Sequence, residues 1–186
     1  MSYTLTDFCD DTRAILQKHD DHAGHEQIRQ KLETLLGNPA FCAEYVGPDN
    51  NTGMSQIFED PKLHFCVLAY NMADARKSPP HDHGSSWAVY GQTTVYTDMT
   101  IWAATGKDEG TIEPVRTFRL DPGNAGLFDV REIHSIDYAA GSKFVRVTGV
   151  DMSMETRRVF DPETATVRTI EQAGTSDTRE PRAKSS

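Results

Sequence analysis

From about Ser55 onward, the sequence is divided into short apolar runs that end at turn residues. These runs are rich in β-branched and aromatic residues, which favour strands. They include KLHFCVLAYNM, WAVYGQTTVYTDMTIWAA, EPVRTFRL, AGLFDV, HSIDY, KFVRVTGVDM and RRVFD. Segments containing Gly, Pro or Asp separate them, as in ATGKDEG, LDPGNAG and YAAGSK. Many short strands without intervening helices predict a closed or sandwiched all-β domain.

The first 45 residues have a different period. Apolar residues recur at helical spacing in LTDFCDDTRAILQKH and HEQIRQKLETLLGN, and NPAFCAEYV is typical of a further short helix that begins at proline. Beyond residue 171 almost no apolar residues remain, which is typical of a flexible tail. We therefore predict a single domain over residues 1–170, with a helical N-terminal cap (1–46), a β-barrel (55–170) and a flexible tail (171–186).

Charge and composition argue against several functions. The 186 residues carry a formal charge of -9 and no face rich in Lys or Arg, which argues against nucleic-acid binding. No run approaches the roughly 20 apolar residues of a membrane helix, so we expect no membrane partner. The polar, acidic N-terminal segment is unlike a secretory signal. Three widely spaced cysteines without a CxxC pair favour reduced thiols, and we expect a cytoplasmic protein.

Two histidines in SPPHDHGSSWAVYGQ are the strongest chemical signal. On a strand, residues i and i+2 point to the same face, so His81 and His83 can present two imidazoles together. His134, at the start of the predicted strand HSIDY, is the candidate for a third ligand. Imidazole nitrogens suit iron, zinc, copper and nickel. Asp129 and Asp137 are near His134 in sequence and are either hydrogen-bond partners of the ligands or ordinary turn and surface carboxylates.

Other histidines favour a simpler interpretation. A lone His-x-His pair is also common outside metal sites, and the context of an all-β pattern with a later strand histidine is what favours coordination here. His19, His22 and His25 lie beside Asp20 and Asp21 between two predicted helices, and we expect them to be solvated.

The arrangement of these motifs resembles the cupin superfamily, whose first motif has the form G(x)5HxH(x)3-4E(x)6G and whose second motif carries one histidine. The chain keeps HxH, but Trp87 and Ala88 stand where the glutamate would fall. A cupin without that carboxylate is similar to the cysteine dioxygenase branch, and the segment SPPHDHGSSWAVYG is most similar to the 3-mercaptopropionate dioxygenases. The resemblance covers about residues 56–152. It implies a cupin (double-stranded β-helix, jelly-roll) barrel and Fe(II) bound by His81, His83 and His134.

One strand departs from that family. Thiol dioxygenases of this kind carry a Ser-x-His-x-Tyr series, and the corresponding stretch FVRVTG places Phe144, Arg146 and Thr148 at those positions. These three share one strand face, whereas Val145 and Val147 share the other. Either Arg146 faces the barrel interior, where it can hold a substrate carboxylate, or the valines fill the core and Arg146 reaches solvent.

Further candidates for substrate contact follow from the alignment with the family. Gln56 falls where cysteine-oxidising members have a carboxylate-binding arginine, and an exposed strand glutamine is the alternative. Among the aromatic residues Tyr70, Trp87, Tyr90 and Tyr96, each of which is more often core than contact, Trp87 is nearest the histidines in sequence. Thr148 completes the predicted set with Arg146.

The leading functional prediction is a non-haem iron dioxygenase that uses O2 and a small carboxylate-bearing substrate, by default a thiol such as 3-mercaptopropionate or cysteine oxidised to a sulfinate. The missing Ser-His-Tyr series leaves open a carbon–carbon-cleaving oxygenase. A metal-dependent lyase or isomerase and a non-enzymatic cupin that binds a small ligand are the other classes. The sequence leaves the oligomeric state open.

Overall fold

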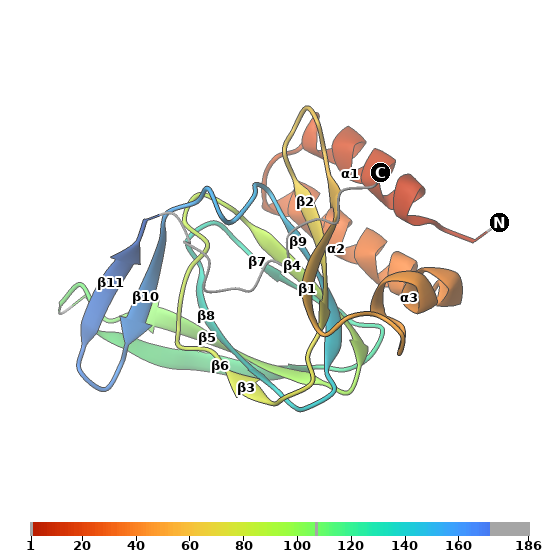
Figure 1. The fold of residues 1–186 in the computed structure, drawn as a ribbon. Helices are drawn as coiled ribbons and strands as arrows, with labels where there is room; N and C mark the ends of the chain where they lie inside the picture. Colours follow the sequence, from red (N-terminus) through yellow and green to blue (C-terminus); the bar gives the residue numbers. More distant parts are fainter. Residues whose placement is uncertain (1, 107, 172–186) are drawn as a thin grey trace.

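In the computed structural model, residues 2–106 and 108–171 are described, and within them three N-terminal helices precede a mainly β domain (Figure 1). The helices are α1 (Leu5–Leu16), α2 (His22–Leu36) and α3 (Pro39–Val46). The strands are β1 (Gly53–Glu59), β2 (Cys66–Asn71), β3 (Arg76–Lys77), β4 (Ala88–Thr94), β5 (Thr97–Ala104), β6 (Ile112–Leu120), β7 (Ala125–Phe128), β8 (Ile133–Tyr138), β9 (Lys143–Thr148), β10 (Arg157–Asp161) and β11 (Thr166–Ile170). Apart from residue 171, the predicted tail lies outside the described residues.

The strand pairing defines the fold. One antiparallel sheet has the order β1-β2-β9-β4-β7 and the other has the order β3-β8-β5-β6. The first strand of the barrel pairs with the last, β2 with β9, and the inner pairs follow as β3 with β8, β4 with β7 and β5 with β6. This is the pairing of one long hairpin wound into two facing sheets, which is the double-stranded β-helix or jelly roll. The predicted fold class, a cupin-type barrel with N-terminal helices, is confirmed.

Alternation along each strand gives the five-stranded sheet two different faces. One face packs against the helices through Val67, Val89, Val145 and Val147, which join the helical residues in one core cluster. Gly91 is needed there, because a Cβ atom at this position would lie 2.8 Å from side-chain atoms of both Leu32 and Leu36. The other face lines the barrel interior. Its core cluster contains residues of both sheets, among them Leu68, Tyr90, Phe128 and Ile136.

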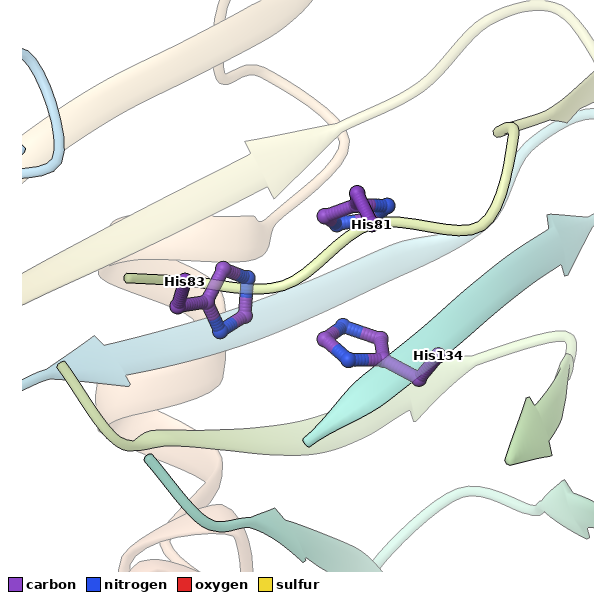
Figure 2. Close-up of side chains that lie close together, drawn as sticks. All are labelled: His81, His83 and His134. Carbon is purple, nitrogen blue, oxygen red and sulfur yellow. The ribbon is translucent and has the colours of Figure 1, made fainter. Parts of the chain in front are cut away.

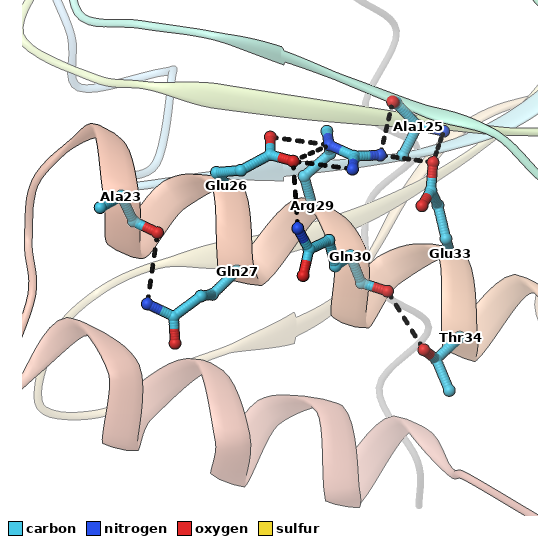
Figure 3. Close-up of polar contacts among 8 residues, drawn as sticks. All are labelled: Ala23, Glu26, Gln27, Arg29, Gln30, Glu33, Thr34 and Ala125. Carbon is cyan, nitrogen blue, oxygen red and sulfur yellow. Dashed lines mark hydrogen bonds and ion pairs between the residues drawn. The ribbon is translucent and has the colours of Figure 1, made fainter.

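Helix α2 also covers the exposed edge of β7. The Arg29 guanidinium donates to the Ala125 carbonyl at 3.2 Å, and the Ala125 amide donates to a Glu33 carboxylate oxygen at 3.0 Å (Figure 3). Arg29 itself pairs with Glu26 and Glu33. These two side chains satisfy edge groups that would otherwise be open to another strand. The helical layer is thereby fixed to the barrel. No helix in the described part of the chain is long and apolar enough to span a membrane.

Candidate metal centre

The segment between β3 and β4 carries the His-Asp-His motif into the barrel. Its start is extended: the His81 amide donates to the His134 carbonyl at 2.9 Å, and the His134 amide donates back at 3.0 Å. After His83 the chain turns, because Gly84 has φ +62° and the Ser86 amide donates to the His83 carbonyl at 3.0 Å. The pair therefore lies on a short extended stretch beside β8, which contributes the third histidine.

The three imidazoles converge at one place. One nitrogen atom of each of His81, His83 and His134 lies within 4.8 Å of those of the other two, and Figure 2 shows the three rings facing a common space. Ring centroids are 4.6 Å apart for His81 and His134 and 4.8 Å for His83 and His134. His83 and His134 are almost completely buried. The sequence prediction that these residues lie together is consistent with this geometry.

Backbone carbonyls orient two of the rings. The Nδ1 atom of His81 lies 2.9 Å from the Pro79 carbonyl oxygen, and that of His134 lies 3.2 Å from the Glu132 carbonyl oxygen. A carbonyl only accepts, so Nδ1 carries the proton in both rings and the Nε2 lone pair is left for a metal. The Nε2 atom of His134 is buried without a hydrogen-bond partner. A buried acceptor of this kind is costly unless another group uses it.

Of the two alternatives for Asp129 and Asp137, the structure favours turn and surface carboxylates. The Asp129 carboxylate lies 2.7 Å from Nδ1 of His22 on α2. Asp137 lies on β8 with its side chain exposed, opposite Lys77 and Asp98 in the adjacent strands. Asp137 is three residues from His134 on one strand and therefore points to the opposite face, whereas a turn at residues 130–131 separates Asp129 from the strand.

Burial keeps the imidazoles neutral. Burial, opposed by the Pro79 hydrogen bond and assisted by the charges of Arg157 and Arg146, lowers the pKa of His81 to about 4. The pKa values of His83 and His134 are also held well below the usual histidine value, first by burial and then by neighbouring charges. Neutral imidazole is the form that coordinates metals. Metal–imidazole bonds of about 2 Å require nitrogens at most about 4 Å apart, so a small ring rotation brings all three within reach of one ion. The residues therefore fit a transition-metal ion.

A cavity of about 310 Å³ opens beside these rings. His81 and Tyr90 line it, and the Tyr90 hydroxyl lies 3.2 Å from Nε2 of His83. Arg146 also lines it, with the guanidinium carbon 5.1 Å from the centre of the Tyr70 ring. Of the two alternatives for Arg146, the structure favours the one that faces the barrel interior. Val145 and Val147 still fill the core, but on the helical side of the sheet.

The other predicted substrate residues lie apart from this cavity. Thr148 is on the same inner face as Arg146, but its hydroxyl donates to the Val150 carbonyl at 2.8 Å and the residue does not line the cavity. Gln56 is on β1, and its amide donates to Glu59 at 2.9 Å. Neither is brought to the imidazoles, and their role in substrate binding stays a prediction.

The prediction that Trp87 contacts the substrate does not agree with its position in the structure. Its indole is buried in the core between sheet and helices, where it stacks on the His25 ring with centroids 4.7 Å apart. The turn at residues 84–86 shifts the alternation, so that Ala88 and Tyr90, rather than Trp87, face the interior. Of the four aromatic residues considered from the sequence, Tyr90 is thus the one whose hydroxyl lies beside a ligand, 3.2 Å from Nε2 of His83. From the sequence, Tyr90 was only one of several aromatic candidates.

The hairpin of β10 and β11 forms a wall of the cavity that sequence reasoning missed. Residues of one hairpin face line the cavity: Arg157, Val159, Arg168 and Ile170. The opposite face is tied to the motif, because the buried Asp82 carboxylate accepts the Arg158 amide at 2.9 Å and its Nε at 2.7 Å. The alternation of RRVFD and TVRTI was a visible signal, but only the register identifies which arginine faces inward.

The sequence matches no protein-family profile, and no curated protein is significantly similar to it. Several solved structures are similar in shape. A cupin superfamily protein from Desulfitobacterium hafniense is 14% identical, with 55% of this chain and 80% of that chain covered and a TM-score of 0.41. KdgF from Halomonas sp. is 14% identical, with 51% and 74% covered and a TM-score of 0.40. A sugar phosphate isomerase of the cupin superfamily from Silicibacter pomeroyi is 16% identical, with 60% and 69% covered and a TM-score of 0.40.

These likenesses are distant, and the strand pairing of the chain itself defines its fold. The chain is a double-stranded β-helix of the cupin type whose barrel gathers three histidines, a candidate metal group, beside a cavity.

Proposed function

We propose that this protein is a non-haem iron(II) dioxygenase that oxidises a small carboxylate-bearing substrate, by default a thiol. One observation carries the proposal: three imidazoles converge with no carboxylate from the described residues in the group, and Nε2 of His134 is buried there without a hydrogen-bond partner. Imidazole donors suit iron, zinc, copper and nickel. Zinc has no redox chemistry, and iron(II) is the metal that the resemblance to the thiol dioxygenases implies. When bound there, iron(II) would supply the activation of molecular oxygen.

The residues around the ligands supply binding and orientation. The Arg146 guanidinium reaches the cavity between the Tyr70 and Tyr90 rings, where a carboxylate can accept two parallel hydrogen bonds. Tyr70 stacks on Phe144 with ring centroids 4.5 Å apart. This aromatic floor limits water around Arg146 and strengthens its attraction for an anion. The Tyr90 hydroxyl lies beside His83 and lines the cavity, so it can donate a hydrogen bond to a bound substrate.

The proposed reaction adds both atoms of O2 to the substrate. For a thiol, RSH and O2 give RSO2H, which ionises to the sulfinate, and sulfur loses the four electrons that oxygen gains. No further organic reductant is needed. Phe144, Arg146 and Thr148 stand where the thiol dioxygenases that the sequence resembles have Ser, His and Tyr, and we propose that Tyr90 acts in place of that series.

The test is metal-dependent oxygen consumption. Protein expressed in iron-rich medium is analysed for metals and then supplied with 3-mercaptopropionate, cysteine and small carboxylates in an oxygen electrode. We expect about one O2 consumed per substrate lost, and loss of this activity on chelation with recovery on adding iron(II). Turnover under nitrogen would instead favour a lyase or isomerase, and binding without turnover under either gas would favour a ligand-binding protein.

Substitution of Arg146 tests the carboxylate contact. Arg146→Ala removes the bidentate partner, so we expect KM for a carboxylate substrate to rise about a hundredfold while KM for its amide changes less than threefold. Arg116→Ala, an exposed arginine on β6 outside the cavity, is the matched control. Equal effects of Arg146→Ala on acid and amide would remove Arg146 from the substrate site.

A further inference from the structure

We propose that the β10–β11 hairpin provides a second anion-binding subsite, formed by Arg157 and Arg168, and that the ligand of this cavity therefore carries two anionic groups. The inference rests on the proposed function in one respect: the first carboxylate is the one assigned to Arg146. It adds the requirement that the ligand carry a second anionic group, which contacts the hairpin.

The charge of the cavity wall is the first argument. Among the described residues, the wall contains four arginines and no Asp or Glu: Arg76, Arg146, Arg157 and Arg168. Imidazole is either neutral or positively charged, so the three histidines add no negative charge to this wall. The whole chain has a formal charge of -9, so this concentration of cations runs against the overall composition. One carboxylate neutralises only one guanidinium, and a metal ion would add more positive charge.

Arg157 is the second argument. Its Nε atom is buried without a hydrogen-bond partner, and no carboxylate of a described residue lies within 4 Å of its guanidinium. Arg157 lines the same cavity as His81, on the inward face of the hairpin. A cation held partly buried and without a counter-charge is costly. A bound anion removes that cost.

Arg158, the next residue on β10, has a carboxylate partner, and among the described residues Arg157 has none. Arg158 points to the other face of the hairpin and is neutralised by Asp82 at 2.7 Å. Its amide also donates to Asp82, which fixes β10 in register beside the motif. The hairpin is thus firmly placed, and the inward face that it presents holds an arginine on each strand. Arg168 lies opposite Val159, two cross-strand pairs along from Arg157 and on the same face of the hairpin.

The two subsites come from different parts of the fold. Arg146 is on β9, in the same cross-strand row as Leu68 and Tyr90 inside the barrel. Arg157 and Arg168 are on the separate hairpin sheet. A ligand that contacts both needs anionic groups at its two ends. Dicarboxylates and carboxylates that also bear a phosphoryl or phosphonyl group share this chemistry, and guanidinium pairs bind both kinds of oxyanion.

Metal-free protein tests this inference independently of catalysis. Dissociation constants are measured by titration calorimetry for propionate, for the dicarboxylates malonate, succinate and glutarate, and for 3-phosphonopropionate. We expect at least one dianion to bind about tenfold more tightly than propionate, and the tighter class identifies the second group. Arg157→Gln should remove that advantage and leave propionate within twofold. Arg168→Gln should act in the same direction, and Arg116→Gln, which removes an equal charge outside the cavity, should change neither value.

Two results would overturn the proposal: no dianion binds more tightly than propionate, or Arg157→Gln and Arg168→Gln behave like Arg116→Gln while their thermal melts match wild type. The outcome is separable from the proposed function. Dianion preference without oxygen consumption would refute the dioxygenase and keep the subsite. Oxygen consumption with a monocarboxylate and no dianion preference would do the reverse.

Discussion

The two faces of the five-stranded sheet each bury a histidine, and they treat it differently. On the helical face, His25 stacks on Trp87, and its Nε2 lies 3.0 Å from an Asp20 carboxylate oxygen. Its Nδ1 is also buried without a hydrogen bond to any described residue, but it lies 3.9 Å from an Asp129 carboxylate oxygen. On the inner face, His134 stacks on Phe128 with ring centroids 4.1 Å apart, but its Nε2 atom has no protein partner. His25 was expected to be solvated, and it is instead buried at the base of α2. Burial alone therefore does not distinguish a structural histidine from a candidate ligand.

The distinguishing feature is where the polar atoms point. On the helical face, the two ring nitrogens of His25 both face carboxylates, those of Asp20 and Asp129. On the inner face, one nitrogen of each of the three imidazoles faces the other two imidazoles. A folded chain rarely leaves buried polar atoms unpaired without a functional reason.

Removing one histidine from each face tests directly whether only the inner-face histidine binds metal. His134→Ala removes one of three ligands, so we expect bound iron to fall more than tenfold relative to wild type and oxygen consumption to be lost. His25→Ala should retain the metal and lower the free energy of unfolding by about 2 kcal/mol, because it loses ring packing. Metal analysis and urea unfolding measure the two effects. Equal metal loss in both variants would contradict the distinction.

A core substitution on the helical side tests whether stability can be lowered without changing metal binding. Leu32 is completely buried and lies against Gly91. Leu32→Ala should lower the free energy of unfolding by about 2–5 kcal/mol through lost burial and the remaining cavity. Metal stoichiometry in the folded protein should stay at the wild-type value. Metal loss at a denaturant concentration where the variant is still folded would show that the two faces are coupled.

A smaller loss of stability is expected when the ion pair between Asp82 and the hairpin is weakened. Asp82→Asn keeps one acceptor oxygen but places an NH2 group against the Arg158 guanidinium. We expect a loss of about 1–2 kcal/mol, since part of Arg158 is exposed to solvent. Hydrogen exchange should become faster for amides of β10 and β11 and stay unchanged in α2. Unchanged exchange in the hairpin would show that the backbone pairing with the motif holds it without the ion pair.

Much of the barrel could be predicted because its signals are local. Alternation and turn residues predicted the strands, and the spacing of HxH predicted two imidazoles on one face. His134 followed from its place at the start of a strand. The placement of Trp87 could not be predicted, since it depends on a change of phase in the turn after His83, to which strict alternation is blind.

The cavity wall was also beyond sequence reasoning. Arg157 and Arg158 are adjacent and chemically identical, so only the pairing of the hairpin with the motif decides which one faces inward. The same holds for Arg146, whose direction depended on which strand face meets the helices. In each of these cases the chemistry of the residue was evident and its orientation was set by contacts distant in sequence.

Asp82 connects the His-Asp-His motif directly to the β10–β11 hairpin. The residue that separates the first two imidazoles along the backbone is itself the anchor of the hairpin. We therefore expect the order of the hairpin and the order of the ligand set to be coupled. If a molecule that binds the hairpin tightens metal binding by some factor, the metal must tighten binding of that molecule by the same factor.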